Sequence, residues 1–189
     1  MSTLQLIKKL KELNIKFINP AILSTVLGSD NQNTVYKTIK RLLKNGVLKK
    51  IDKGKFVLDD SDTNDFEIAN FIVSPSYISL ESALSFYGIL PQFPYSITSV
   101  TTERSRIIDK YEYTTISNRF FSGYYKQNNF LIASPEKALV DYLYLASKGL
   151  RNSDIEEWDL TSINKNNFSD ICSKINFAPF RKLIKKIKI

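Results

Sequence analysis

Residues 31–58 constrain the fold more than any other part of the chain, because their apolar residues follow a helical spacing and then a hairpin pattern. Four of them stand at positions i, i+4, i+7 and i+8: Val35, Ile39, Leu42 and Leu43. This spacing predicts a helix over about residues 33–45 with one buried stripe, ended by Gly46. Residues 47–58 then hold two short apolar segments around the turn Asp52-Lys53-Gly54. That pattern predicts a β-hairpin.

The face of this helix opposite the stripe is basic. It carries Tyr36, Lys37, Lys40, Arg41 and Lys44, and residues 31–45 contain no acid. A helix stabilised by its own surface ion pairs has Glu or Asp three or four residues from its cations. The like charges here therefore repel each other unless a polyanion is bound. The hairpin adds a basic rim of Lys49, Lys50, Lys53 and Lys55.

Two further helices are predicted upstream. Ser2 can cap the first, whose apolar face would consist of Leu4, Leu6, Ile7, Leu10 and Leu13. Asn19 and Pro20 are typical of the first positions of a helix, and Gly28 of its end. Three helices followed by a basic hairpin are the element order of a winged helix-turn-helix. We therefore expect residues 1–59 to form such a domain.

In this kind of domain the third helix enters the major groove of DNA and the hairpin contacts the backbone beside it. Residues at the start of the third helix would then lie near the base edges: Asn33, Thr34, Tyr36 and Lys37. Phosphates, which position a protein without specifying sequence, would be bound by Lys40, Arg41, Lys44, Lys53 and Lys55. Lys49, on the hairpin rim, completes the candidate DNA-binding set. About five phosphate contacts would make log K fall with log salt at a slope near −4.5.

Two other interpretations of the basic surface stay open. Exposed lysines are commonly just solvated, and some winged helices bind protein instead of DNA. DNA binding is the preferred interpretation because charge, periodicity, capping and hairpin all agree.

The charge is distributed unevenly along the chain, which indicates two domains. Residues 1–58 contain 12 Lys or Arg and three acids, a net charge of +9, whereas residues 59–180 have a net charge of −6. The polar, acidic stretch LDDSDTNDFE, residues 58–67, has the composition of a short linker. We place the domain boundary there, with domains at 1–59 and 60–189.

The second domain is expected to be mixed α/β, with a small sheet and several helices, which makes the whole chain α+β. Segments 96–102, 111–116 and 128–133 have the composition of strands. Helices are expected over 65–73, from Ser79 to Gly88, from Ser134 to Gly149, and over about 164–175 and 178–188.

The basic tail 181–189 has three open interpretations: a second DNA contact, a contact with another anionic partner, or a frayed end.

Several function classes are disfavoured by residues that the chain lacks. It has no histidine, so zinc sites and catalytic triads that use histidine are excluded. Phosphate-binding glycine motifs are absent, and we expect no cofactor, no metal and no enzymatic activity. Ser134 and Lys137 match the Ser-x-x-Lys pattern of acyltransferases, but Ser134 has a complete explanation as a helix cap. One cysteine, Cys172, and the lack of a signal peptide or long apolar run favour a cytoplasmic protein without a membrane anchor.

In the expected second domain, two segments resemble segments of a known family, and the distance between them in the sequence also matches. The segments are YISLESALSFYG, residues 77–88, and SPEKALVDYLYL, residues 134–145. With TSVTTERSR and YEYTTI between them, they make the chain similar to the AbiEi family from about Leu4 to Gly149. The last forty residues or so lie outside the resemblance.

The resemblance implies an antitoxin and transcriptional autoregulator of a type IV toxin–antitoxin system, of the kind linked to abortive infection by phage. Such a protein binds inverted repeats in its own promoter and represses its operon. It also counteracts an AbiEii-like nucleotidyltransferase toxin, in general without a stable complex. The alternatives are a winged-helix protein-interaction module or a regulator without antitoxin activity, and, from another class, an enzyme that acts on nucleotides or nucleic acid.

Overall fold

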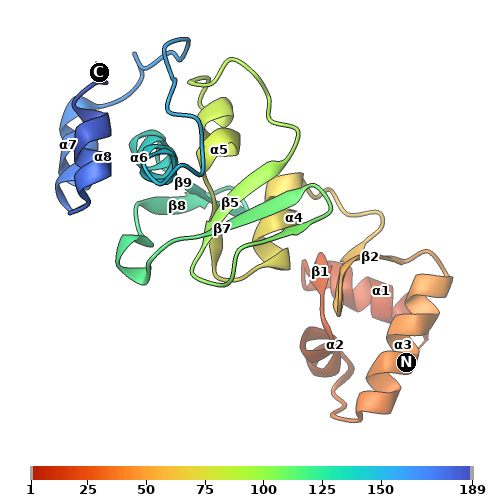
Figure 1. The fold of residues 1–189 in the computed structure, drawn as a ribbon. Helices are drawn as coiled ribbons and strands as arrows, with labels where there is room; N and C mark the ends of the chain where they lie inside the picture. Colours follow the sequence, from red (N-terminus) through yellow and green to blue (C-terminus); the bar gives the residue numbers. More distant parts are fainter. Residues whose placement is uncertain (1, 188–189) are drawn as a thin grey trace. The chain divides into compact units, whose positions relative to one another are not determined.

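The computed structural model describes residues 2–187, which form a mixed α+β protein of two compact units (Figure 1). The N-terminal unit is Met1–Asn64 and the C-terminal unit is Asp65–Ile189. None of the helices in the described residues combines the length and the apolar character that crossing a bilayer requires.

The acidic segment 59–62 belongs to the N-terminal unit, so the division lies slightly later than the boundary placed after Asp59 from the sequence. Asp59 pairs with Lys49 (Nζ to Oδ1, 2.5 Å), and Asp60 pairs with Lys11 (Nζ to Oδ2, 2.5 Å). The change in net charge along the sequence marks the residue at which the acidic segment begins. In the structure, Asp59 and Asp60 of that segment pair with lysines of the N-terminal unit and therefore belong to it.

The N-terminal unit consists of three helices and a three-stranded antiparallel sheet. The helices are α1 (Thr3–Glu12), α2 (Pro20–Leu27) and α3 (Gln32–Lys44). The strands are β1 (Phe17–Ile18), β2 (Leu48–Asp52) and β3 (Lys55–Leu58), in the order β1-β3-β2. The pattern predicted the helices and the hairpin correctly. It missed β1, because two residues are too short to show an alternation.

Side-chain caps set the ends of the first two helices where the sequence indicated. Ser2 and Gln5 form a capping box, in which each side chain accepts the other residue's backbone N–H. Asn19 caps α2 with Pro20 in its first turn, and Gly28 ends it in the left-handed region (φ 63°).

One hydrophobic core holds the N-terminal unit together. Its fully or almost fully buried members come from all three helices and all three strands: Leu6, Leu10, Ile18, Leu23, Val26, Val35, Ile39, Leu42, Leu48, Phe56 and Leu58. Three residues assigned to the apolar face of the first helix lie outside this core, Leu4, Leu13 and the partly exposed Ile7. Leu4 and Leu13 are 78% and 55% exposed, because they stand at the ends of α1, beyond the elements that cover its middle.

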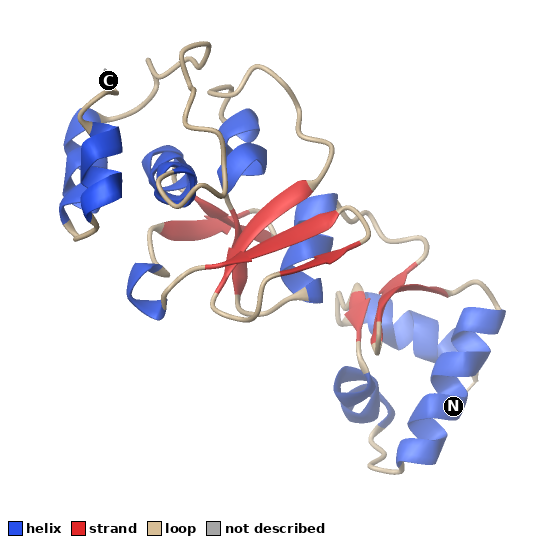
Figure 2. Ribbon diagram, viewed as in Figure 1, coloured by secondary structure: helices blue, strands red, loops and turns tan. Residues whose placement is uncertain are grey.

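A six-stranded mixed sheet forms the centre of the C-terminal unit (Figure 2). Its strands are β4 (Ser76–Ile78), β5 (Ile97–Thr101), β6 (Arg106–Ile108), β7 (Tyr111–Thr115), β8 (Tyr124–Gln127) and β9 (Phe130–Ala133). They lie in the order β6-β7-β5-β4-β9-β8, with β4–β9 and β5–β7 parallel and the other neighbours antiparallel. The sequence predicted β5, β7 and β9 alone. The short β4 was taken for a turn because it follows Ser74-Pro75, and the edge strands β6 and β8 are largely exposed.

Helices cover both faces of this sheet. They are α4 (Asp65–Ile72), α5 (Leu80–Phe86), α6 (Pro135–Ala146), α7 (Lys165–Ser173) and α8 (Ala178–Ile184). Helix α4 lies on one face, where Tyr113 of β7 donates a hydrogen bond to the Ala69 carbonyl (2.7 Å), and α5 and α6 lie on the other (Figure 1). Helices α7 and α8 pack against α6. The predicted helix 178–188 ends at Ile184, and Lys188 lies outside the described residues.

A buried ion pair joins α6 to β4. Lys137 and Asp141 stand one turn apart on α6 and pair through Nζ and Oδ1, with side chains only 4% and 3% exposed. The second oxygen of Asp141 accepts hydrogen bonds from Tyr77 Oη and Ser79 Oγ, both at 2.9 Å. Burial raises the pKa of Asp141, against the lowering effect of the Lys137 ammonium and of these hydrogen bonds.

Ser79 and Ser134, which begin two predicted helices of the C-terminal unit, are used differently. Ser134 accepts the N–H of Lys137 at 3.2 Å and caps α6 as predicted, while the Lys137 ammonium contacts Asp141. Ser79 stands at the N-cap position of α5, but its hydroxyl bonds to Asp141. Thr98 of β5 replaces it, because its Oγ1 accepts the N–H of the third helical residue, Ser82 (2.9 Å).

Replacing Asp141 with Asn should destabilise the protein strongly. The change leaves the buried Lys137 ammonium without its counter-charge, which costs about 3–5 kcal/mol in comparable buried pairs. Asp170→Asn is the matched control, because Asp170 forms the same i,i+4 pair with Lys174 on an exposed surface (67% and 66% exposed). We expect that loss to stay below about 1 kcal/mol. Urea unfolding followed by circular dichroism measures both, and equal small losses would contradict the role given to the pair.

The thiol of Cys172 should be unreactive in the folded protein. Cys172 is buried on α7, and burial raises its pKa to about 12, so almost no thiolate is present at pH 8. A disulfide reagent such as DTNB should label the thiol rapidly in 6 M guanidinium chloride and at least about 100-fold more slowly under native conditions. Equal labelling rates in the two solvents would show that the thiol is accessible.

Candidate nucleic-acid interface

Helix α3 has one buried half and one exposed half. Its buried residues are Val35, Thr38, Ile39 and Leu42. At about 100° per residue, the remaining side chains of the predicted set occupy an arc of roughly 160° on the other side. All seven are exposed: Asn33, Thr34, Tyr36, Lys37, Lys40, Arg41 and Lys44. The structure therefore brings the seven helical candidates together on a single face.

The start of α3 is held by Asn31. Its Oδ1 accepts the backbone N–H groups of Asn33 (3.0 Å) and Thr34 (3.3 Å). The backbone of both residues is thereby fixed, and their side chains remain exposed. Tyr36, one position after the buried Val35, is 53% exposed, which is unusual for an aromatic residue that has a core beside it.

The end of α3 leads directly into the hairpin. Gly46 adopts a left-handed conformation (φ 67°), and the Val47 N–H donates to the Leu42 carbonyl (2.9 Å). These features form a Schellman motif, in which glycine carries no Cβ penalty. The chain can therefore reverse within two residues, and β2 starts beside the last turn of α3.

The four cations of α3 have no carboxylate partner among the described residues. The ion pairs among residues 2–187 do not include Lys37, Lys40, Arg41 or Lys44. The repulsion among these four like charges is therefore relieved only by solvent and salt. An external polyanion would remove it, and this is the electrostatic property expected of a phosphate-binding surface.

The hairpin contributes less than the sequence indicated. Lys53 is exposed at the hairpin tip beside Gly54, and Lys55 is half-buried. Lys49 was expected to be uncompensated, but it pairs with Asp59. The pair is exposed (70% and 41%), so it contributes at most about 1 kcal/mol and a phosphate can replace the carboxylate. The expectation failed because Asp59 lies past the end of the hairpin in sequence, although its N–H bonds to the Val47 carbonyl beside β2.

Lys50 is a further basic residue on this hairpin that was not included in the candidate set. It is exposed, like its neighbour Lys49. The two residues pair in regular register with Phe56 and Val57 of β3, on a strand at the edge of the sheet. The sequence analysis had placed Lys50 on the basic rim of the hairpin.

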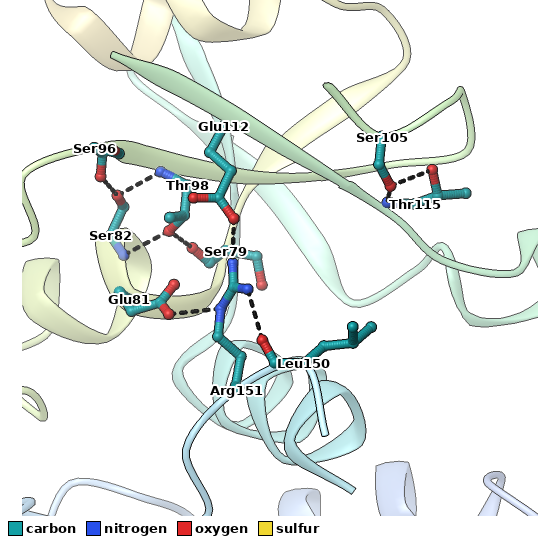
Figure 3. A network of polar contacts seen from close by, with 10 residues as sticks. All are labelled: Ser79, Glu81, Ser82, Ser96, Thr98, Ser105, Glu112, Thr115, Leu150 and Arg151. Carbon is teal, nitrogen blue, oxygen red and sulfur yellow. Dashed lines mark hydrogen bonds and ion pairs between the residues drawn. The ribbon is translucent and has the colours of Figure 1, made fainter. Parts of the chain in front are cut away.

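Arg151 is the centre of a second polar cluster, in the C-terminal unit (Figure 3). Its Nε lies 2.7 Å from Oε1 of Glu81 on α5, and its Nη2 lies 2.5 Å from Oε1 of Glu112 on β7. The three side chains are 18–27% exposed. The arginine thus neutralises two carboxylates and ties a helix, a strand and the segment after α6 together. Sequence reasoning had no signal for it, because the three residues are far apart along the chain.

No profile of a known protein family matches the chain, and a comparison with curated proteins also finds no match. Among the described residues, no group of three or more acidic or cysteine side chains is arranged to hold a metal ion.

Proposed function

We propose that the N-terminal unit is a winged helix-turn-helix domain that binds double-stranded DNA, with α3 in the major groove and the β2–β3 hairpin beside the backbone. The observation that carries the proposal is the exposed half of α3, whose cations have no acidic partner within the described residues. A helix that used this face for protein binding would be expected to carry apolar anchors there, and Tyr36 is its single aromatic residue.

The proposed roles follow the position of each residue along α3. Asn33, Thr34, Tyr36 and Lys37 stand in the first turns and would approach the base edges. Phosphates would be bound by the cations of the later turns and of the hairpin: Lys40, Arg41, Lys44, Lys53 and Lys55. Lys49 joins this second set when a phosphate displaces Asp59.

We further propose that DNA binding represses the protein's own operon through inverted repeats in its promoter, and that the C-terminal unit acts as the antitoxin against an AbiEii-like nucleotidyltransferase toxin. This part rests on the resemblance to the AbiEi family in residues 77–88 and 134–145. In the fold these two segments are in direct contact, because Tyr77 and Ser79 donate hydrogen bonds to Asp141. The segments therefore act as one structural unit.

Replacing Lys40 and Arg41 together with Glu should abolish retention of a duplex that carries the region upstream of the gene. The change converts two phosphate contacts into two repulsions on an exposed face where no folding contact is lost. Arg106→Glu with Lys126→Glu is the matched control, since it reverses the same two residue types at exposed positions of the C-terminal unit.

Fluorescence anisotropy at several salt concentrations measures the effect. The wild-type protein should show a slope of log K against log salt at least as steep as about −4.5, and a preference over random duplex. A wild-type protein that binds neither duplex would refute the DNA-binding proposal and favour a protein partner for α3.

In a growth assay with the toxin, the Lys40→Glu, Arg41→Glu variant should still neutralise the toxin. Loss of both activities in a folded variant would contradict the division of labour between the units.

A further inference from the structure

The last described helix, α8, carries a compact basic face. Arg181, Lys182 and Lys185 are exposed, whereas Phe180 is completely buried. At about 100° per residue the three cations fall within roughly 100° of one another on the side away from Phe180. Residues 177–187 contain no acid, so the helix does not compensate its own charge.

The direction of these cations is fixed by packing. The Phe180 ring lies 6.3 Å from the Tyr144 ring of α6, and the Phe177 ring lies 6.1 Å from it. The Arg181 N–H donates to the Phe177 carbonyl and closes the first turn. Over residues 178–184 the basic tail is therefore an anchored helix and not a frayed end.

Four other cations of the C-terminal unit have a carboxylate partner: Lys110, Lys137, Arg151 and Lys174. In contrast, none of the ion pairs formed within residues 2–187 involves Arg181, Lys182 or Lys185.

Lys186 is set apart from these three, although it is also exposed. It lines a surface hollow whose lining also includes Asp154, Glu156 and Asp159. Arg181, Lys182 and Lys185 do not line this hollow, so the basic face is defined by these three residues.

Two simpler roles do not account for this face. Arg181 and Lys182 stand in the last turn of α8 and Lys185 at its C-cap, so they also stabilise the helix dipole, but that effect does not require three cations on one side. A basic amphipathic helix can lie on an anionic membrane, but it does so by inserting its apolar face. The apolar face of α8 is occupied by its contacts with α6.

We propose that Arg181, Lys182 and Lys185 form a second phosphate-binding surface for duplex DNA, in the C-terminal unit. The inference rests on the proposed DNA-binding function and extends it beyond α3 and the hairpin. Arg181 and Lys185 are about 6 Å apart along the helix axis, which is close to the rise of two nucleotides along a duplex axis, at about 3.4 Å each. Contacts of this kind add affinity and salt dependence but no sequence preference.

The test is the variant Arg181→Gln, Lys182→Gln, Lys185→Gln in the full chain, titrated with the upstream duplex from 50 to 200 mM salt. Glutamine keeps a high helix propensity, and the replaced side chains are exposed. Three contacts added to the five of the N-terminal unit would give the wild type a slope near −7.2, and their loss should return the slope to about −4.5, a change of about 2.7. Over this salt range the wild-type protein should therefore lose about 40-fold more affinity than the variant.

A matched control removes one arginine and two lysines elsewhere in the same unit: Arg104→Gln, Lys126→Gln, Lys174→Gln. Its slope should equal that of the wild type. If the α8 variant also keeps the wild-type slope, the inference is overturned, while a loss of binding in the Lys40→Glu, Arg41→Glu variant would still support the proposed function. A wild-type protein that binds no duplex overturns both the α8 inference and the proposed DNA-binding function.

Two further measurements keep the outcome interpretable. Far-ultraviolet circular dichroism and the thermal midpoint of unfolding show whether the triple variant is folded. If it is not, the double variant Lys182→Gln, Lys185→Gln replaces it, with an expected slope change of about 1.8.

Vesicles with 30% phosphatidylserine test the membrane alternative. Binding of these vesicles that the α8 variant loses, with an unchanged DNA slope, would assign the face to membranes and overturn the inference.

Discussion

Burial of the apolar stripe of α3 is the constraint on which the proposed function depends. Val35, Ile39 and Leu42 are at most 4% exposed, and burying side chains of this size contributes about 1.5–3 kcal/mol each. A helix cannot bury one half without turning the other half to solvent. Because the cations of α3 alternate with this stripe at helical spacing, the free energy of core formation also orients them. Electrostatic repulsion among them is much weaker than the burial that holds them in place.

The ion pairs of the N-terminal unit sort its positive charge into two groups. Segment 59–62 supplies acids to Lys11 and Lys49, on α1 and β2, whereas the cations of α3 receive none within the described residues. The unit remains basic, but its uncompensated charge is concentrated on one helix. For a protein that must meet a polyanion in a defined orientation, this distribution matters more than the total charge.

The C-terminal unit depends on a different interaction, the buried ion pair between Lys137 and Asp141. Asp141 is stabilised by Lys137 and by the hydroxyl groups of Tyr77 and Ser79, so the packing of α6 on the sheet is coupled to the position of these two residues. Such a pair adds little net stability compared with apolar residues, but it makes alternative packings costly. This explains how two segments more than fifty residues apart can define one structural unit.

The sequence by itself determined the features that depend on near neighbours in the chain. It located the capped starts of α1, α2 and α6, the stripe of α3 and the hairpin after Gly46, because spacing and capping chemistry act over a few residues. It also located all seven candidate residues of α3, since one helix has one exposed face. Only the tertiary structure decided the rest: the pairing of β1, β4, β6 and β8, the neutralisation of Lys49 by Asp59, the use of Ser79 by Asp141, and the position of Arg151 between Glu81 and Glu112. Each of these joins residues that are remote in sequence, and such contacts form only when burial of the core brings the elements together.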